Sequence, residues 1–240
     1  MPCRVQGVTY MNLGKRLSAA LELLAECDGS IVADIGSDHA YLAVAALKSG
    51  AAKRAIASDI NPGPLESGRA NAKLHGADIE FVLSDGFDAL EDKGVTAAAI
   101  CGMGGETIAA ILEKSACAKK CRLILQPMSG QEKLRAFLYG NGYRILRERF
   151  VTDCGKPYTV MLVKYTGISE EFTYTDLYLG KERPEGADFA LYAEKEAYRA
   201  EKRLRGNITS ARRADENALI RECQMHSTNF SAGTSPASAD

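Results

Sequence analysis

The stretch IVADIGSDHAYLAVAALKSG, residues 31–50, decides the fold of this chain. Its short apolar run ends at Asp34, Gly36 follows, and after a polar turn the apolar residues recur at helical spacing. A strand that stops at a glycine lets a ligand come close to the backbone, and the helix that follows points its N-terminal amides at that ligand. The stretch therefore predicts the first strand, turn and helix of a nucleotide-binding α/β unit.

The turn itself narrows the kind of nucleotide. Gly36 is followed by SDHA, so the GxGxxG fingerprint of dinucleotide-binding folds is absent. Asp38 lies at the expected helix start, where it would repel a pyrophosphate, although an aspartate there also caps a helix well. A cationic or zwitterionic nucleoside fits this turn better, and S-adenosylmethionine is the candidate cofactor. The candidate cofactor-binding residues of this segment are Asp34, Gly36, Ser37 and His39, and a place on the first helical turn is the structural alternative for His39.

The composition sets limits on partners and compartment. A chain of 240 residues with 46% hydrophobic and 25% charged residues suits one full domain with an appendage. The net charge of -1 means that any nucleic-acid surface must be a local patch. Seven cysteines with no CxxC pattern indicate reduced thiols in a cytoplasm rather than a metal site. No apolar run approaches the roughly 20 residues of a membrane span, so we expect no membrane insertion.

Strand and helix patterns alternate along most of the chain. We expect strands over residues 54–59, 79–83, 97–101 and 122–126, and helices over residues 13–27, 63–75, 105–114 and 131–139. Two segments, residues 143–152 and 157–165, alternate apolar and polar side chains and predict a closing β-hairpin. Parallel strands that end in an antiparallel hairpin are the layout of class I methyltransferases. The predicted fold class is therefore α/β, with a Rossmann-like methyltransferase sheet over residues 1–167.

The character of the sequence changes after Gly167. Residues 187–223 are rich in charge and helical in pattern, with a break expected at Gly206 and Asn207. We expect residues 168–226 to form a small helical, coiled-coil-like domain. Residues 227–240 are small and polar, and we expect them to be disordered.

Two acidic residues follow the second and third predicted strands. Asp59 lies 23 residues after Gly36, where a carboxylate commonly accepts both ribose hydroxyls of a bound nucleoside. Asp85 and Gly86 end the third strand, where an acidic side chain commonly meets the exocyclic amine of the cofactor adenine. The structural alternatives are a solvated strand-end aspartate for Asp59 and a plain Asp-Gly turn for the other pair.

A glycine-rich segment, CGMGG at residues 101–105, follows the fourth predicted strand. Its glycines permit close backbone approach at the edge of the sheet where cofactor and target meet, unless the loop is merely flexible. The Asn-Pro-Pro-aromatic type of motif that many amino-group methyltransferases carry here is absent, so only backbone carbonyls are available. The catalytic candidates are Asp38, Gly102, Met103 and Gly104, and Cys101 is a further candidate cofactor contact.

Two more polar residues are candidates near the same edge. Arg16, in LGKRL, is a candidate contact for the carboxylate of the cofactor's methionine, with a surface position on a helix as the alternative. Gln126 ends the fifth predicted strand, and for it we favour a structural role.

These motifs together resemble one family. LGKRL, VADIGSDHAYL, SDINPGP, SDGF, CGMGGETI, LILQP and GKPYTVMLV, spread over residues 12–165, are similar to the bacterial tRNA (adenine-22-N1)-methyltransferases. The resemblance implies methyl transfer from S-adenosylmethionine to ring N1 of a tRNA adenine, with tRNA as the partner. It also implies a C-terminal helical, coiled-coil-like domain. In this setting we assign Asp38 an electrostatic role, with the backbone carbonyls of residues 102–104 beside it.

A tRNA substrate requires a basic surface, and the tail helices offer candidates. These are Lys195, Arg199, Lys202, Arg203, Arg205, Arg212 and Arg213. Acidic residues are interleaved with them, so a solvated helix surface is the alternative.

Three other function classes remain open from the sequence. A class I methyltransferase acting on a protein or a small metabolite would share the cofactor residues. A non-catalytic RNA-binding protein with a relic cofactor fold would bind no cofactor. An NAD-dependent oxidoreductase is disfavoured by the absent GxGxxG.

Overall fold

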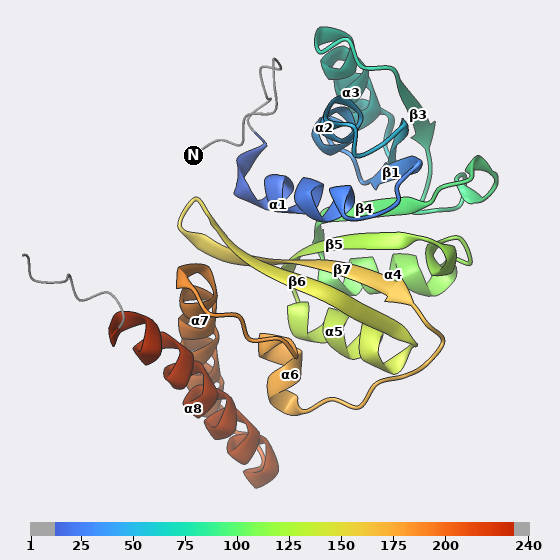
Figure 1. The fold of residues 1–240 in the computed structure, drawn as a ribbon. Coiled ribbons are helices and arrows are strands. Elements are labelled where there is room, and N and C mark those ends of the chain that lie inside the picture. Colours follow the sequence, from blue (N-terminus) through green and yellow to red (C-terminus); the bar gives the residue numbers. More distant parts are fainter. Residues whose placement is uncertain (1–12, 233–240) are drawn as a thin grey trace, which may run out of the picture.

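The computed structural model describes residues 13–232, and within them the chain forms a seven-stranded mixed sheet (Figure 1). The strand order is β3-β2-β1-β4-β5-β7-β6. The strands are β1 (Ile31–Ile35), β2 (Arg54–Asp59), β3 (Ile79–Leu83), β4 (Ala97–Gly104), β5 (Arg122–Ser129), β6 (Tyr143–Asp153) and β7 (Lys156–Tyr165). Neighbours from β3 to β5 are parallel, and β7 pairs antiparallel with both β5 and β6. The predicted Rossmann-like methyltransferase sheet with its terminal hairpin is confirmed.

Helices cover both faces of this sheet, so the catalytic part has three layers. The helices are α1 (Gly14–Ala25), α2 (Tyr41–Ser49), α3 (Pro62–Leu74), α4 (Gly105–Lys114), α5 (Gln131–Gly140), α6 (Tyr174–Leu179), α7 (Ala187–Leu204) and α8 (Ser210–Ala232), with short 3-10 turns η1 (Glu91–Lys93) and η2 (Ala118–Lys120). Buried residues of α1, α2 and α3 pack on one face, and those of α4 and α5 pack on the other. Within β1, Val32 packs toward α1 while Ala33 and Ile35 pack toward α4, as the two-residue period of a strand requires. The parallel strands β1, β2, β4 and β5 are therefore largely buried on both sides, whereas the edge strand β3 is only partly buried.

Two central strands run further than the sequence predicts. β4 continues through the glycine-rich segment to Gly104, and β5 continues through Pro127 to Ser129, with shifts of register where the two strands pair. The prediction that residues 101–105 form a loop is wrong up to Gly104. Pro127 is tolerated because β7 pairs with β5 only as far as Leu125, so the missing N–H breaks no bond to β7.

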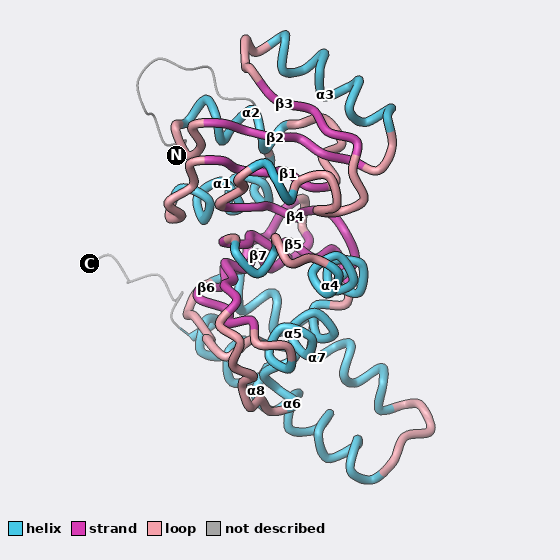
Figure 2. Tube along the Cα trace, turned by 90° about the vertical axis from the view of Figure 1, so that its right-hand side faces the viewer, coloured by secondary structure: helices cyan, strands magenta, loops and turns pink. Residues whose placement is uncertain are grey.

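The C-terminal helices form a separate cluster that docks on β6. α7 and α8 run side by side as a hairpin, and the predicted break between them at Gly206 and Asn207 is confirmed (Figures 1 and 2). Phe150 of β6 packs edge-on against Phe189 of α7, with ring centroids 4.7 Å apart. α8 continues to Ala232, so the expectation of disorder is wrong for residues 227–232, and residues 233–240 lie outside the described part.

A buried ion pair ties these helices to the sheet. The Arg135 guanidinium of α5 is fully buried and meets the Glu148 carboxylate of β6 at 2.5 Å. The same guanidinium donates to the backbone carbonyls of Leu177 and Tyr178 in α6, at 2.7 and 3.0 Å. Burial acts to lower the pKa of Arg135, but the Glu148 charge, Tyr192 and the hydrogen bonds to both together outweigh it and raise that pKa. Arg135 therefore stays charged and holds α6 against the catalytic part.

Candidate functional site

The candidate site is built around the turn that follows β1. Gly36 has φ +72°, in the left-handed region that glycine adopts without strain. The backbone amides of Gly36 and Ser37 both donate to the Ser58 carbonyl of β2, at 2.8 and 3.0 Å. The turn is thus fixed beside the end of β2, as the strand–turn–helix pattern predicts. A Cβ added at Gly36 would come within 2.0 Å of the Met103 Cε, so the flexible end of that methionine would have to move to admit a side chain.

Asp34 supplies a buried carboxylate directly before this turn. Its Oδ2 accepts from the Ser37 hydroxyl at 2.7 Å and from the Ala43 amide at 3.3 Å. Burial raises the pKa of Asp34 to about 6, and these two hydrogen bonds oppose that rise. The same carboxylate faces Cys101, whose thiol pKa is raised by burial and then by the Asp34 charge. Cys101 is therefore a neutral wall of the site and not a nucleophile.

The turn is longer than the sequence indicates. α2 begins at Tyr41, and its N-cap is Ala40 with φ 53°, without any side-chain cap. The expectation that Asp38 lies at the helix start and could cap it is wrong, and so is the first-turn position considered for His39. The His39 carbonyl instead accepts from the Asn71 side chain of α3 at 2.8 Å, a long-range contact that fixes the turn. The Asp38 side chain is 79% exposed, and its only described ion-pair partner is the His39 ring, 3.4 Å away.

One buried amide oxygen joins the glycine-rich segment to α1. The side-chain Oε1 of Gln126 accepts from the Gly102 amide at 3.2 Å and from the Arg16 Nη1 at 3.0 Å. Gly102 has φ +84°, and no atom lies within 4 Å of the place of an added Cβ, so its backbone borders open space. Arg16 is further held by the Asp153 carboxylate at 3.3 Å and lies over the Tyr158 ring. The surface alternative for Arg16 is therefore wrong, because its guanidinium is anchored at the sheet edge.

These elements enclose a cavity of about 350 Å³ at the carboxyl ends of β1 and β4. Nine of the thirteen residues selected from the sequence line it, namely Arg16, Asp34, Gly36, Ser37, Asp38, His39, Cys101, Gly102 and Met103. The lining also includes Tyr41, which sequence reasoning did not select. Its ring is 41% exposed and lies 5.3 Å from the His39 ring. The sequence feature that could have predicted Tyr41 as a lining residue is an aromatic side chain directly after a polar turn.

Four selected residues lie outside this lining, namely Asp59, Asp85, Gly86 and Gly104. Asp59 ends β2 next to the Ser58 carbonyl that holds the Gly36 turn, and its Oδ1 accepts from the Asn61 amide at 2.8 Å. Gly104 is the N-cap of α4. The next glycine, Gly105, packs so closely on Gly130 that an added Cβ would lie 2.2 Å from the Gly130 carbonyl oxygen. The glycine-rich segment thus serves two purposes, an open backbone at Gly102 and close packing of α4 on β5 at Gly105.

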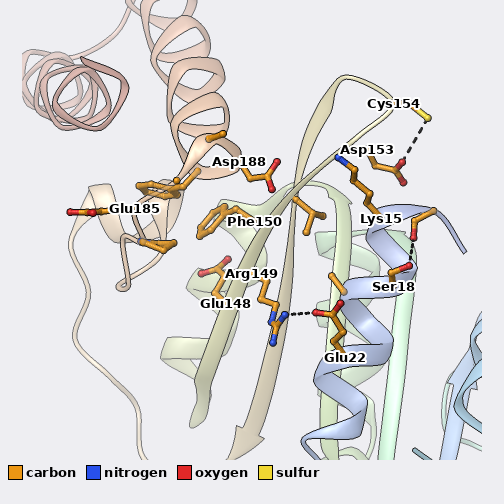
Figure 3. A pocket seen from close by; sticks show the side chains of 17 residues that line it. Lys15, Ser18, Glu22, Glu148, Arg149, Phe150, Asp153, Cys154, Glu185 and Asp188 are labelled. Carbon is orange, nitrogen blue, oxygen red and sulfur yellow. Dashed lines mark hydrogen bonds and ion pairs between the residues drawn. The ribbon is translucent and has the colours of Figure 1, made fainter. Parts of the chain in front are cut away.

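A larger cavity, of about 920 Å³, lies between α1, β6 and the segment that leads into α7 (Figure 3). Carboxylates predominate among its charged residues, which are Lys15, Glu22, Glu148, Arg149, Asp153, Glu185 and Asp188. Arg149 pairs with Glu22, as the dashed line in Figure 3 marks. Asp153 also binds Arg16 of the smaller cavity, so this one ion pair separates the two spaces. The acidic lining makes the larger cavity a poor host for phosphate.

The basic residues of the tail helices differ in whether they form ion pairs with other described residues. Arg203 of α7 binds the buried Glu216 carboxylate of α8 at 2.7 Å and so holds the two helices together, while Arg212 binds the same carboxylate at 3.1 Å from within α8. Arg199 pairs with Glu196, and Arg213 donates to the Leu204 carbonyl. Lys195, Lys202 and Arg205 have no ion-pair partner among residues 13–232. Partial burial and the Arg199 charge lower the pKa of Lys195, the Glu196 charge opposes them, and the Lys156 charge adds to the lowering.

Comparison with known proteins identifies the family. A methyltransferase-domain family model matches residues 13–161. The chain is 36% identical over 170 residues to the tRNA (adenine(22)-N(1))-methyltransferase of Bacillus subtilis, which covers 66% of this chain and 71% of that protein. The chain belongs to this family of tRNA methyltransferases.

Solved structures agree with this membership. The B. subtilis m1A22 tRNA methyltransferase TrmK superposes with a TM-score of 0.71 at 28% identity, covering 91% of this chain and 98% of that one. The Streptococcus pneumoniae protein Sp1610, solved in complex with S-adenosyl-L-methionine, gives 0.75 at 30% identity over 89% and 98%. Among the described residues of the present family member, no group of three or more His, Cys, Asp or Glu could hold a metal ion. No helix in that part of the chain is long and apolar enough to cross a membrane.

Proposed function

We propose that this chain transfers the methyl group of S-adenosylmethionine to ring N1 of adenine 22 in tRNA. The observation that carries the proposal is the cavity that brings a buried carboxylate, Asp34, a side-chain-free turn at Gly36 and an open backbone at Gly102 to one sheet edge. Ligands of open α/β sheets bind at this edge. Family membership supplies the substrate class.

The lining fits a nucleoside that carries an amino group, a carboxylate and a ribose. Both hydrogen bonds that Asp34 accepts from described residues go to Oδ2, which leaves Oδ1 for the amino group of the cofactor's methionine. Arg16, anchored by Gln126, is the partner for the methionine carboxylate. Asp59 stands at the end of β2 for the ribose hydroxyls, with Asp85 and Gly86 after β3 for the adenine. When bound, S-adenosylmethionine supplies an electrophilic methyl group on a sulfonium.

The chain contributes position and charge rather than proton transfer. Adenine N1 carries an in-plane lone pair, so it attacks the methyl carbon without losing a proton, and the sulfur keeps the electron pair of the broken bond. The positive charge then resides on the adenine ring. Asp38 and the carbonyls of Gly102 and Met103 stand where they stabilise that charge, and Tyr41 offers a ring on which the base stacks. N1 lies on the Watson–Crick edge, so the adenine must be exposed before it enters the cavity.

The tRNA contacts are assigned to cations that make no ion pair with another described residue. Lys195 and Lys202 lie on α7, and Lys156 of the β6–β7 hairpin lies near Lys195. Arg203 and Arg212 are left out because Glu216 binds both. The reaction belongs in the cytoplasm, a compartment that suits the free thiols of the six described cysteines.

The test is incubation of the full chain with labelled S-adenosylmethionine and unmodified tRNA, followed by nucleoside analysis. The expected product is N1-methyladenosine in tRNA with adenine at position 22 and none in a matched transcript with guanine there. A labelled product at another base or atom would contradict the proposal. Calorimetry with S-adenosylhomocysteine tests a second alternative, the non-catalytic RNA-binding protein, because that protein would bind no S-adenosylhomocysteine.

A further inference from the structure

The amino-terminal edge of the sheet carries a row of like charges. Arg122 of β5 is directly opposite Lys164 of β7, and Lys164 is directly opposite Arg144 of β6 on its other side. Side chains at one register position stand next to one another on the same face, where like charges destabilise the pair. Arg144 is relieved by Glu170 at 3.0 Å, whereas Arg122 and Lys164 have no ion-pair partner among the described residues.

A cavity of about 490 Å³ lies at this row. Lys119 and Lys120 of η2 line it together with Arg122 and Lys164, so four cations from three elements face one space. Two carboxylates, Glu26 and Asp28, also line it. Glu26 is already engaged by Arg147 at 3.4 Å and Arg149 at 3.0 Å. The lining is therefore strongly positive.

Arg122 is the least satisfied of these cations. Its Nη1 is buried and has no hydrogen-bond partner in the described structure. An unpaired guanidinium nitrogen that is shielded from water is costly, and an anionic oxygen is the acceptor that removes the cost. Thr96 does not serve, because its hydroxyl is already bonded to the Ile31 backbone.

We propose that this cavity, lined by Lys119, Lys120, Arg122 and Lys164, binds a phosphate group. A phosphate offers several acceptor oxygens and up to two negative charges, which matches four cations better than one carboxylate does. The cavity is distinct from the cofactor site, because Arg122 is the first residue of β5 and the cofactor site lies at the other end of the strands. Cys101 of the cofactor cavity pairs with Gln126, four residues beyond Arg122, so about 13 Å of strand at roughly 3.3 Å per residue separates the two cavities.

The phosphate has two possible sources, a second stretch of the tRNA backbone or a free phosphate compound. The first source rests on the proposed function and the second does not. In either case the exposed residues Lys120 and Lys164 are suitable for substitution, because changing them disturbs no buried contact. The test variant is therefore Lys120→Gln with Lys164→Gln in the full chain. The matched control is Lys53→Gln with Lys73→Gln, which removes two exposed lysines on the β2–α3 side of the sheet.

Three measurements decide the matter. Calorimetry with inorganic pyrophosphate reports the site directly, the salt dependence of tRNA binding counts phosphate contacts, and S-adenosylhomocysteine binding reports the cofactor site. We expect the test variant to bind pyrophosphate at least tenfold more weakly than the control variant, with cofactor binding unchanged. If the phosphate is part of tRNA, the log–log salt slope also falls by about 0.7 to 0.9, the loss for one phosphate contact.

The outcomes separate the sources and the proposals. A weaker pyrophosphate interaction with an unchanged tRNA slope assigns the site to a free phosphate compound. Equal pyrophosphate affinity and equal slope in the test and control variants overturn the site. Absence of S-adenosylhomocysteine binding would contradict the proposed function, and the pyrophosphate measurement would still report on this cavity.

Discussion

The Arg135–Glu148 pair makes a strong prediction for Glu148→Gln. The substitution keeps the shape of the side chain but removes the charge that compensates Arg135, which is 0% exposed. Removing one partner of a buried pair costs about 3–5 kcal/mol, because the remaining charge is left in the interior. Arg135 would keep its bonds to the carbonyls of Leu177 and Tyr178, so the loss falls on the charge itself. For a protein of this size the midpoint of thermal unfolding should fall by roughly 6–20 °C.

A surface pair one residue away on β6 supplies the control. Glu22→Gln breaks the pair with Arg149, in which the Glu22 side chain is 60% exposed and the Arg149 side chain 35% exposed. We therefore expect this variant to lose about 0–1 kcal/mol of unfolding free energy. Both variants and the parent are compared by urea unfolding followed by far-ultraviolet circular dichroism. If Glu148→Gln loses no more unfolding free energy than Glu22→Gln, the buried pair is not the anchor of the C-terminal helices. Deleting everything after Gly167 would also strip Arg135 of its α6 partners, so that deletion would change stability together with tRNA binding.

Three further predictions concern the cofactor site. Gly36→Ala should weaken S-adenosylhomocysteine binding about tenfold, because a Cβ at φ +72° costs roughly 1–2 kcal/mol and also contacts Met103. Adding Met103→Ala should recover only part of this loss. Full recovery would show that contact with Met103, and not backbone strain, causes the loss. Burial raises the pKa of Asp34 to about 6, so the folded chain takes up this proton before the unfolded chain does, and the cost of the buried charge is relieved as pH falls below about 6. Over the same range calorimetry should show S-adenosylhomocysteine binding weaken, because the protonated carboxyl loses its attraction for the amino group; in Asp34→Asn that dependence should be absent. Asp38→Ala should lower the rate of methyl transfer about tenfold while the S-adenosylhomocysteine dissociation constant changes little, because the exposed carboxylate acts on the charge formed on adenine. Equal losses in rate and binding would make Asp38 a cofactor ligand.

Most of the fold could be predicted because local pattern and tertiary environment agree. The buried strands read as continuous apolar runs, and Gly36 marks the turn because glycine adopts its φ of +72° without strain. The predictions from sequence were wrong where contacts between residues far apart in the sequence set the local structure. The bond from the Asn71 side chain to the His39 carbonyl helps to hold the turn open to Ala40, and no local pattern signals a contact across 32 residues.

The tail and the strand ends show the same limit. Residues 227–232 are small and polar, but the helix persists past Cys223, which is buried against α7, and His226 packs on the Phe189 ring. Gln126 was given a structural role from sequence, and its link to Arg16 and Gly102 depends on the pairing of β4 with β5. Cavity lining by Tyr41 likewise required the true start of α2.

The buried attachment at Arg135 has a consequence for how a target base is chosen. The enclosed guanidinium bonds to two carbonyls of α6, and α6 packs with α7 and α8 in one buried cluster, so the tail helices are held against the sheet. If tRNA rests on α7 as proposed, the separation between α7 and the cofactor cavity decides which nucleotide reaches that cavity. The enzyme would then select its adenine by the distance of that nucleotide from the RNA segment bound to α7, before it contacts any base edge.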